Sequence, residues 1–153
     1  MTHLHGRLQR WARPWLLRVA LAALLAPAAA GAAALAEADV RAVRSVIQAQ
    51  LDAFAADDAE RAFSYASAAL RTQFGDAATF MAMVRAGYPM VVRPETVAFF
   101  QPQSSDGVVW QTVRLRDRAG RLWLATYQLA QQADAGWRIH GCVVAADAGK
   151  SST

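Results

Sequence analysis

The fold is decided by residues 96–144, whose sequence is TVAFFQPQSSDGVVWQTVRLRDRAGRLWLATYQLAQQADAGWRIHGCVV. β-Branched and aromatic residues are frequent in four parts of this stretch, and short polar residues with Gly or Pro separate them. This pattern is typical of antiparallel strands joined by hairpin turns. We therefore predict strands over Thr96–Gln101, Val108–Arg116, Arg121–Gln131 and Trp137–Val144, with turns over Gln103–Gly107, Asp117–Gly120 and Ala133–Gly136.

The residues before this stretch predict helices. Apolar side chains in Val40–Phe54 recur at helical spacing and so share one face. Asp57–Glu60 has the pattern of a capping box, in which the first residue caps a second helix. Asp76 caps a third helix, which Gly87 closes in the left-handed conformation and which Pro89 prevents from continuing. Helices followed by a strand meander predict an α+β fold, with N-terminal helices packed on a curved antiparallel sheet.

The charge of the chain is concentrated at its N-terminus. The 153 residues contain 16 basic and 12 acidic residues, and the four unbalanced arginines all lie in residues 1–36. Basic residues there precede the apolar run Val19–Ala26, and Ala34-Leu35-Ala36 is a small-residue cleavage pattern before Glu37. We predict a Sec-type signal peptide over 1–36, cut between Ala36 and Glu37, and a periplasmic or secreted protein. An uncleaved anchor over Val19–Ala36 and a cut near Ala28–Ala30 are the alternatives.

The remainder is predicted to be one domain over 37–147 with a flexible tail over 148–153. Its 12 basic and 12 acidic residues balance. A neutral domain without a basic, aromatic-lined patch excludes nucleic acid as a partner, and we expect membrane contact only through the uncut leader. The single Cys excludes an internal disulfide framework.

Three motifs carry a resemblance to a known family. They are IQAQLDAFAADDAERAFSYAS (Ile47–Ser67), FMAMVRAGYPMVVRP (Phe80–Pro94) and GWRIHGC (Gly136–Cys142). Together they resemble the bacterial domain of unknown function 4864, although Ala68-Ala69 and Met90 stand where that family usually has proline. The order of elements is similar to the nuclear-transport-factor-2-like (SnoaL-like) superfamily. That resemblance implies a cone-shaped fold with a cavity between helices and sheet.

The candidate ligand-binding residues are the polar and aromatic side chains expected to line such a cavity: Tyr65, Tyr88, Arg93, Gln111, Tyr127 and His140. For Tyr65 and Tyr127 the alternative is a core position with the hydroxyl at the rim. Arg93 precedes a proline that fixes its direction, which suits a carboxylate or phosphate, but a structural ion pair would also explain it. Strict alternation in the last strand places Arg138, His140 and Cys142 on one side and Trp137, Ile139 and Val143 on the other.

No catalytic residue, metal site or cofactor is predicted. His140 and Cys142 are about 7 Å apart along a strand, too far for a nucleophile–base pair. No carboxylate lies within the apolar alternation of a strand, where desolvation would raise its pKa for acid–base chemistry. Our hypothesis is a non-enzymatic module that binds a small apolar or aromatic ligand, or associates through its sheet as a homodimer. The alternative is a SnoaL-like isomerase, cyclase or dehydratase acting on a small cyclic substrate.

Overall fold

Helices precede strands in this protein, which confirms the predicted α+β class. The structure is a computed structural model that describes residues 34–133 and 135–149. Most of the predicted leader and tail therefore lies outside the described residues. The helices are α1 (Glu37–Ala55), α2 (Ala59–Ser64), α3 (Ala68–Phe74), α4 (Ala77–Gly87) and α5 (Pro89–Val92). The strands are β1 (Thr96–Phe99), β2 (Gln103–Ser105), β3 (Val108–Arg116), β4 (Leu122–Gln132) and β5 (Gly136–Ala146).

The strands form one antiparallel sheet in the order β1-β3-β4-β5, and β2 also pairs with β3. β1 pairs with the C-terminal half of β3 and β2 with its start, so the two are pieces of one interrupted edge. The prediction of a turn over Gln103–Gly107 was too long. Only Asp106 and Gly107 turn, with φ of 51° and 77°, because an Asp-Gly pair with two positive φ angles matches the twist of a two-residue hairpin.

An irregularity in β5 overturns the predicted alternation of that strand. Gln128 pairs with Gly141 but Leu129 pairs with Ile139, so His140 is an extra residue in a β-bulge. The extra residue moves every later side chain to the opposite face. Cys142 consequently lies on the same face as Ile139, next to its cross-strand partner Tyr127. Val143 lies on the other face and is 67 % exposed.

The helix starts were predicted in part. Asp76 caps α4 as expected, and its carboxylate accepts a 2.7 Å hydrogen bond from the Thr79 amide. The cap of α2, however, is Asp58 and not Asp57. Asp57 has a φ of 62° and forms an ion pair with Arg85, so its side chain joins α4 to the turn after α1.

Helix α3 and the single turn α5 were not predicted. Ser67 caps α3 through a 3.2 Å hydrogen bond from the Leu70 amide, and Gly75 closes that helix with a φ of 81°. Gly87 remains helical at the end of α4 instead of closing it in the left-handed conformation. Pro89 ends α4, but it also starts α5, because the first helical position requires no backbone N–H.

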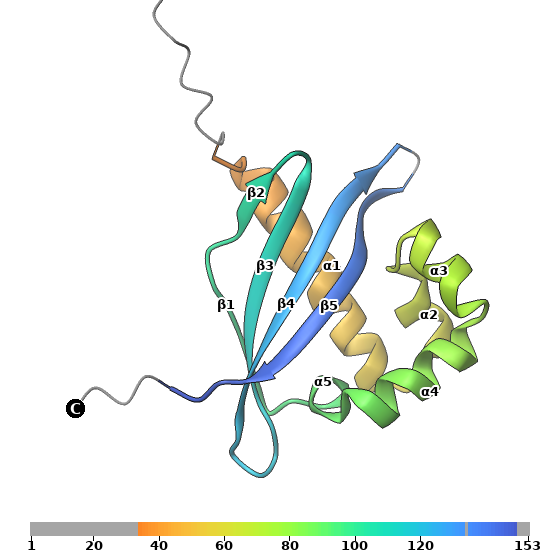
Figure 1. The fold of residues 1–153 in the computed structure, drawn as a ribbon, viewed down its shortest axis with the longest axis vertical. Helices are drawn as coiled ribbons and strands as arrows, with labels where there is room; N and C mark the ends of the chain where they lie inside the picture. The colour runs from red at the N-terminus through yellow and green to blue at the C-terminus, as the bar shows by residue number, and fades with distance from the viewer. Residues whose placement is uncertain (1–33, 134, 150–153) are drawn as a thin grey trace, which may run out of the picture.

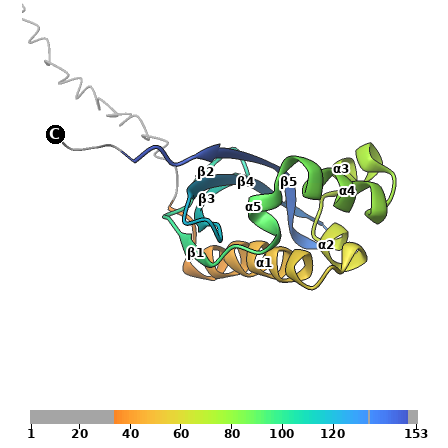
Figure 2. The same ribbon diagram turned by 90° about the horizontal axis from the view of Figure 1, so that it is seen from below.

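The helices cover one face of the sheet. In Figure 1, α1 crosses the sheet, and α2, α3 and α4 gather beyond β5. The same arrangement seen from below shows α1 under the sheet and α5 between α1 and β5 (Figure 2). The edge of β5 is partly covered, since Ile139 donates to the Tyr65 carbonyl (2.9 Å) and accepts from the Ser67 amide (2.8 Å). The core lies between these layers and includes Val43, Ile47, Leu51, Val113, Leu115 and Leu129.

No helix within 34–133 and 135–149 is both long and apolar enough to cross a membrane.

Candidate functional site

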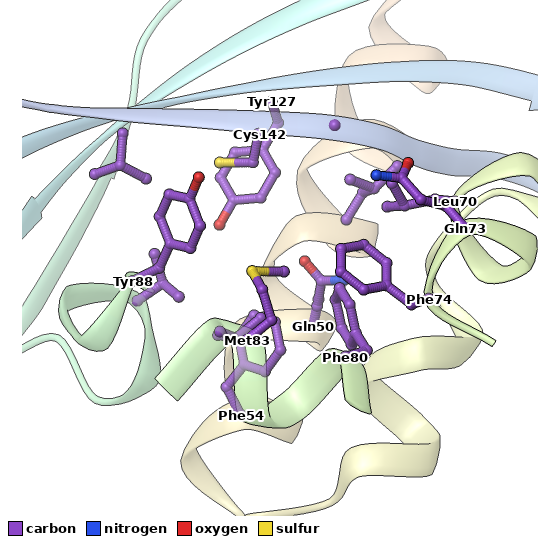
Figure 3. Close-up of a pocket in the computed structure, with 15 residues that line it drawn as sticks. Gln50, Phe54, Leu70, Gln73, Phe74, Phe80, Met83, Tyr88, Tyr127 and Cys142 are labelled. Carbon is purple, nitrogen blue, oxygen red and sulfur yellow. The ribbon is translucent and has the colours of Figure 1, made fainter. Parts of the chain in front are cut away.

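A pocket of about 210 Å³ opens between the helices and the inner face of β4 and β5. Helices α1, α3, α4 and α5 supply one wall, and the two strands supply the other (Figure 3). Most of its surface is apolar. Its lining residues are Gln50, Phe54, Leu70, Gln73, Phe74, Phe80, Met83, Val84, Tyr88, Val91, Tyr127, Ile139, Gly141, Cys142 and Val144.

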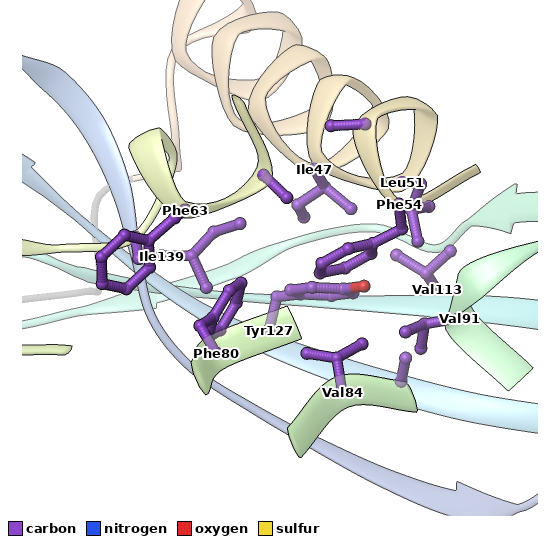
Figure 4. Packing of buried hydrophobic residues seen from close by; sticks show 14 of the residues in the cluster. Ile47, Leu51, Phe54, Phe63, Phe80, Val84, Val91, Val113, Tyr127 and Ile139 are labelled. Carbon is purple, nitrogen blue, oxygen red and sulfur yellow. The ribbon is translucent and has the colours of Figure 1, made fainter. Parts of the chain in front are cut away.

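Tyr127 and Cys142 form the polar part of the strand wall. They are cross-strand partners, so their side chains leave the sheet side by side. The Tyr127 ring is 2 % exposed and lies among Phe54, Phe80 and Val113 (Figure 4). Tyr127 and Tyr88 both line the pocket (Figure 3). The Cys142 thiol hydrogen-bonds Tyr127, and Tyr88 adds a second hydroxyl to the lining of the pocket.

Burial keeps both strand groups uncharged. Desolvation raises the pKa of the Cys142 thiol to about 12, although hydrogen bonding with Tyr127 opposes this. Desolvation also raises the pKa of Tyr127 well above its ordinary value. A thiolate is the nucleophilic form of cysteine, and Cys142 does not supply it near neutral pH. The pair can donate or accept a hydrogen bond, but it cannot act as an activated nucleophile.

Gln50 is the polar group on the helix wall. It lies on the apolar face of α1, one turn from Ile47 and Phe54, and is 3 % exposed. Its amide Nε2 donates to the Ala62 carbonyl at 3.1 Å, which fixes the side chain. The Oε1 atom points toward the pocket (Figure 3). A buried amide oxygen in this position is an acceptor for a ligand hydroxyl or amine.

The lining of the pocket contains no carboxylate, imidazole, ammonium or guanidinium group from the described residues. Within the same ranges, no cluster of three or more His, Cys, Asp or Glu side chains is arranged to hold a metal ion. The site offers uncharged hydrogen-bonding groups in an apolar surround. Such an arrangement is chemically suited to a neutral molecule rather than to a charged one.

Two of the six predicted ligand-binding residues, Tyr88 and Tyr127, line this pocket. Tyr65 does not line it. Its backbone carbonyl holds β5, and its side chain hydrogen-bonds Arg61, raising the pKa of that guanidinium. His140 is also outside the pocket, because the bulge leaves it exposed.

Gln111 and Arg93 make structural contacts elsewhere. Gln111 is completely buried in β3, and its Nε2 donates to the Phe100 and Thr112 carbonyls at 2.7 and 2.9 Å. It closes the interruption between β1 and β2, where the edge strand leaves the ladder. Arg93 donates from Nε and Nη2 to the Ala55 carbonyl at 3.0 and 2.9 Å, at the C-terminus of α1.

The pocket is also lined by four residues that were not predicted from the sequence: Gln50, Gln73, Met83 and Cys142. Gln50 had a signal, since a polar residue on the apolar face of a helix is unusual and often functional. Cys142 was assigned to the wrong face because a bulge cannot be read from alternation. Gln73 lies in α3, which was not predicted.

A family model described as domain of unknown function DUF4864 matches residues 34–152. Comparisons with the curated proteins and with the solved structures found no match.

Proposed function

The chain belongs to the DUF4864 family, and from that premise we propose that it binds a small, uncharged, largely apolar molecule in the pocket between the helices and β4–β5. The observation that carries the proposal is the combination of apolar walls with three neutral polar groups on facing walls. Gln50 presents an acceptor from α1, and Tyr88 and Tyr127 present hydroxyls. A ligand with one hydroxyl or carbonyl group on an apolar body fits this arrangement.

The pocket volume limits the size of that ligand. A cavity of about 150 Å³ lined by aliphatic and aromatic side chains is known to hold benzene. A pocket of about 210 Å³ therefore suits one substituted ring or a short chain. A charged ligand is disfavoured, because no ionised group lines the pocket to compensate its desolvation.

Binding without catalysis is favoured over the alternative of a SnoaL-like isomerase, cyclase or dehydratase. That chemistry requires a carboxylate or imidazole in the cavity to move a proton. The lining drawn from the described residues has neither, and Cys142 is kept protonated by burial. We still infer membership of the nuclear-transport-factor-2-like superfamily and its cone-shaped fold. The order of helices and strands, with a pocket enclosed between them, supports that inference.

The binding proposal is tested by adding p-cresol, toluene and p-toluate to the full chain and following heteronuclear NMR spectra. We expect p-cresol to shift the amides of Cys142 and Val144 at the lowest concentration, toluene to bind more weakly, and the anionic p-toluate to leave them unmoved. Met83→Trp fills the pocket and should abolish these shifts. Met90→Trp, a matched change outside the pocket, should retain them. Equal binding of p-toluate would refute the neutral site.

The uncovered face of the sheet favours a second function, association of two copies of the chain. Val143 and Phe100 on that face are 67 % and 40 % exposed, and Trp110 and Leu124 border the same surface. Sheet surfaces with exposed apolar side chains are common interfaces. We expect sedimentation to give a dimer that Val143→Asp converts to a monomer. The matched change Ala78→Asp on α4 should leave the dimer intact, and a wild-type monomer would remove this candidate.

We further propose that the protein is exported and acts in the periplasm or outside the cell. The concentration of unbalanced arginines in residues 1–36, before an apolar run, supports this location. Mass spectrometry of the protein recovered from its own cells should give Glu37 as the first residue. A mass that includes residues 1–36 would instead support the uncleaved anchor.

A further inference from the structure

A second concave surface lies away from the pocket, between the α4–α5 end of the helical layer and the β3–β4 hairpin. This arginine groove has a volume of about 590 Å³. Four arginines from different parts of the chain line it: Arg85 near the end of α4, Arg93 after α5, and Arg118 and Arg121 in the hairpin. We propose that the arginine groove binds an oxyanion, in the form of a phosphate group carried on a small apolar body.

The carboxylates near the groove leave part of its positive charge uncompensated. Asp57 pairs with Arg85, and Asp117 pairs with Arg121 at 2.8 Å. Among the described residues, Arg93 hydrogen-bonds a neutral carbonyl, and neither Arg93 nor Arg118 forms an ion pair. Two guanidinium groups in one concave surface therefore make no ion pair with the part of the chain that the structure describes. An anion bound there gains from both.

Both carboxylate oxygens of Asp117 are occupied by hydrogen bonds from groups other than Arg118. Its Oδ1 accepts from the amides of Ala119 and Arg121 at 2.9 Å each, and its Oδ2 accepts from Arg121 Nε and from the Trp123 indole at 3.0 Å. The hydrogen bonds from the Trp123 indole, which has the largest effect, and from Arg121 lower the pKa of Asp117. The same four bonds hold the hairpin backbone in one conformation. Asp117 thus balances the charge of Arg121 and shapes the groove, and it forms no ion pair with Arg118.

Arg93 is positioned in advance of any ligand. Two of its nitrogens, Nε and Nη2, are bound to the Ala55 carbonyl. A guanidinium has five N–H donors in a rigid plane, so the Nη1 edge remains to donate to a second acceptor. A side chain that these two hydrogen bonds already orient loses less entropy when an oxyanion binds than a free one does.

The groove also has an apolar component. Pro89, Met90, Val92 and Trp123 line it beside the arginines. Arginines around an apolar surface fit a phosphate ester better than a free inorganic ion. The alkyl part of the ester packs against the apolar side chains, while the guanidinium groups bind the phosphate oxygens. The site is separate from the neutral pocket, and it is independent of the proposed function.

The proposal is tested by NMR titration of the full chain, following the Nε–Hε signals of Arg93 and Arg121 and the amide of Ala119. Site-resolved signals separate the groove from the basic residues in 1–36. The probes are inorganic phosphate, butyl phosphate, dihexanoyl phosphatidylglycerol and, as the uncharged analogue, 1-butanol. We expect butyl phosphate to shift these signals at lower concentration than inorganic phosphate, and 1-butanol to leave them unmoved.

Variants define the role of the charge. Arg118→Glu should weaken butyl phosphate binding about tenfold or more, because each hydrogen bond between charged groups contributes strongly, whereas Arg118→Lys should largely preserve it. Arg71→Glu makes the same charge change on exposed α3, outside the groove, and should have little effect. Shifts with phosphatidylglycerol alone would support the site and identify a lipid headgroup as its source. No shift with any phosphate, equal shifts with 1-butanol, or equal weakening by Arg71→Glu would overturn it.

Discussion

Raising the pH should destabilise the wild-type protein more than a Cys142→Ala variant, because Cys142 titrates later in the folded than in the unfolded chain. Burial raises the pKa of this thiol from an ordinary 9.0 to about 12. Between these values the unfolded chain has lost the thiol proton and the folded chain still holds it. Stability that is complete below the unfolded pKa is therefore lost as the pH rises toward the folded one.

The size of the effect follows from the two pKa values. Linkage gives a loss from Cys142 of about 0.4 kcal/mol at about pH 9 and about 1.4 kcal/mol at about pH 10, relative to about pH 7. Tyr127 adds a loss in the same direction, since burial also raises its pKa. That second contribution is retained in Cys142→Ala, so the difference between the two proteins isolates the thiol.

Urea denaturation of both proteins under reducing conditions, at several pH values between about 7 and 10, measures this difference. The absolute stability of Cys142→Ala is immaterial, because only the change with pH is compared. The free energy of unfolding should fall more steeply with pH in the wild type. If both proteins show the same pH dependence, the thiol has an ordinary pKa in the folded protein. The conclusion that Cys142 is buried in the strand wall of the pocket would then be wrong.

Three other changes test the architecture around the pocket. Phe80→Ala should reduce the free energy of unfolding by about 3–5 kcal/mol in urea denaturation, because the ring packs on Phe54, Phe63 and Phe74 with centroids 6.0, 5.3 and 5.4 Å away. Ser67→Ala should cost about 1 kcal/mol by the same measurement, since it removes the cap of α3; an unchanged midpoint would mean that α3 does not depend on this cap. Asp117→Asn should lower the thermal midpoint near neutral pH and flatten its acid dependence. The pKa of Asp117 is depressed below its usual 3.8 by the Trp123 indole above all, so its stabilisation is lost as the pH falls through the lower value; parallel acid profiles of the two proteins would contradict this account.

Local signals were predictive where one residue controls the backbone around it. Asp76 was identified as a helix cap because its side chain bonds an amide three residues away, and the hairpin after β3 was located by its Asp and Gly. The same reasoning failed at Asp57 and Asp58, where two adjacent candidates compete. Asp58 is the cap, and Asp57 has a positive φ and forms an ion pair with Arg85, 28 positions along the chain.

The candidate site was predictable only in part, for a comparable reason. Tyr88 and Tyr127 were identified because an aromatic ring with a hydroxyl often lies at a cavity rim. Cys142 was missed because one bulged residue, His140, reverses the faces of the strand after it. Arg93 was recognised as a directed guanidinium, but its partner in the structure is the carbonyl that ends α1.

The sequence by itself determined the fold class, the family and the uneven distribution of charge, because periodicity, motifs and composition are local properties of the chain. Only the tertiary structure decided which side chains meet. It brought Gln50 of α1 to the same pocket as Tyr127 and Cys142, and it gathered Arg93 and Arg118 in one groove. The physical reason is that a pocket is formed by residues distant in sequence. Their meeting depends on strand register, on a single bulge and on how the helices pack across the sheet.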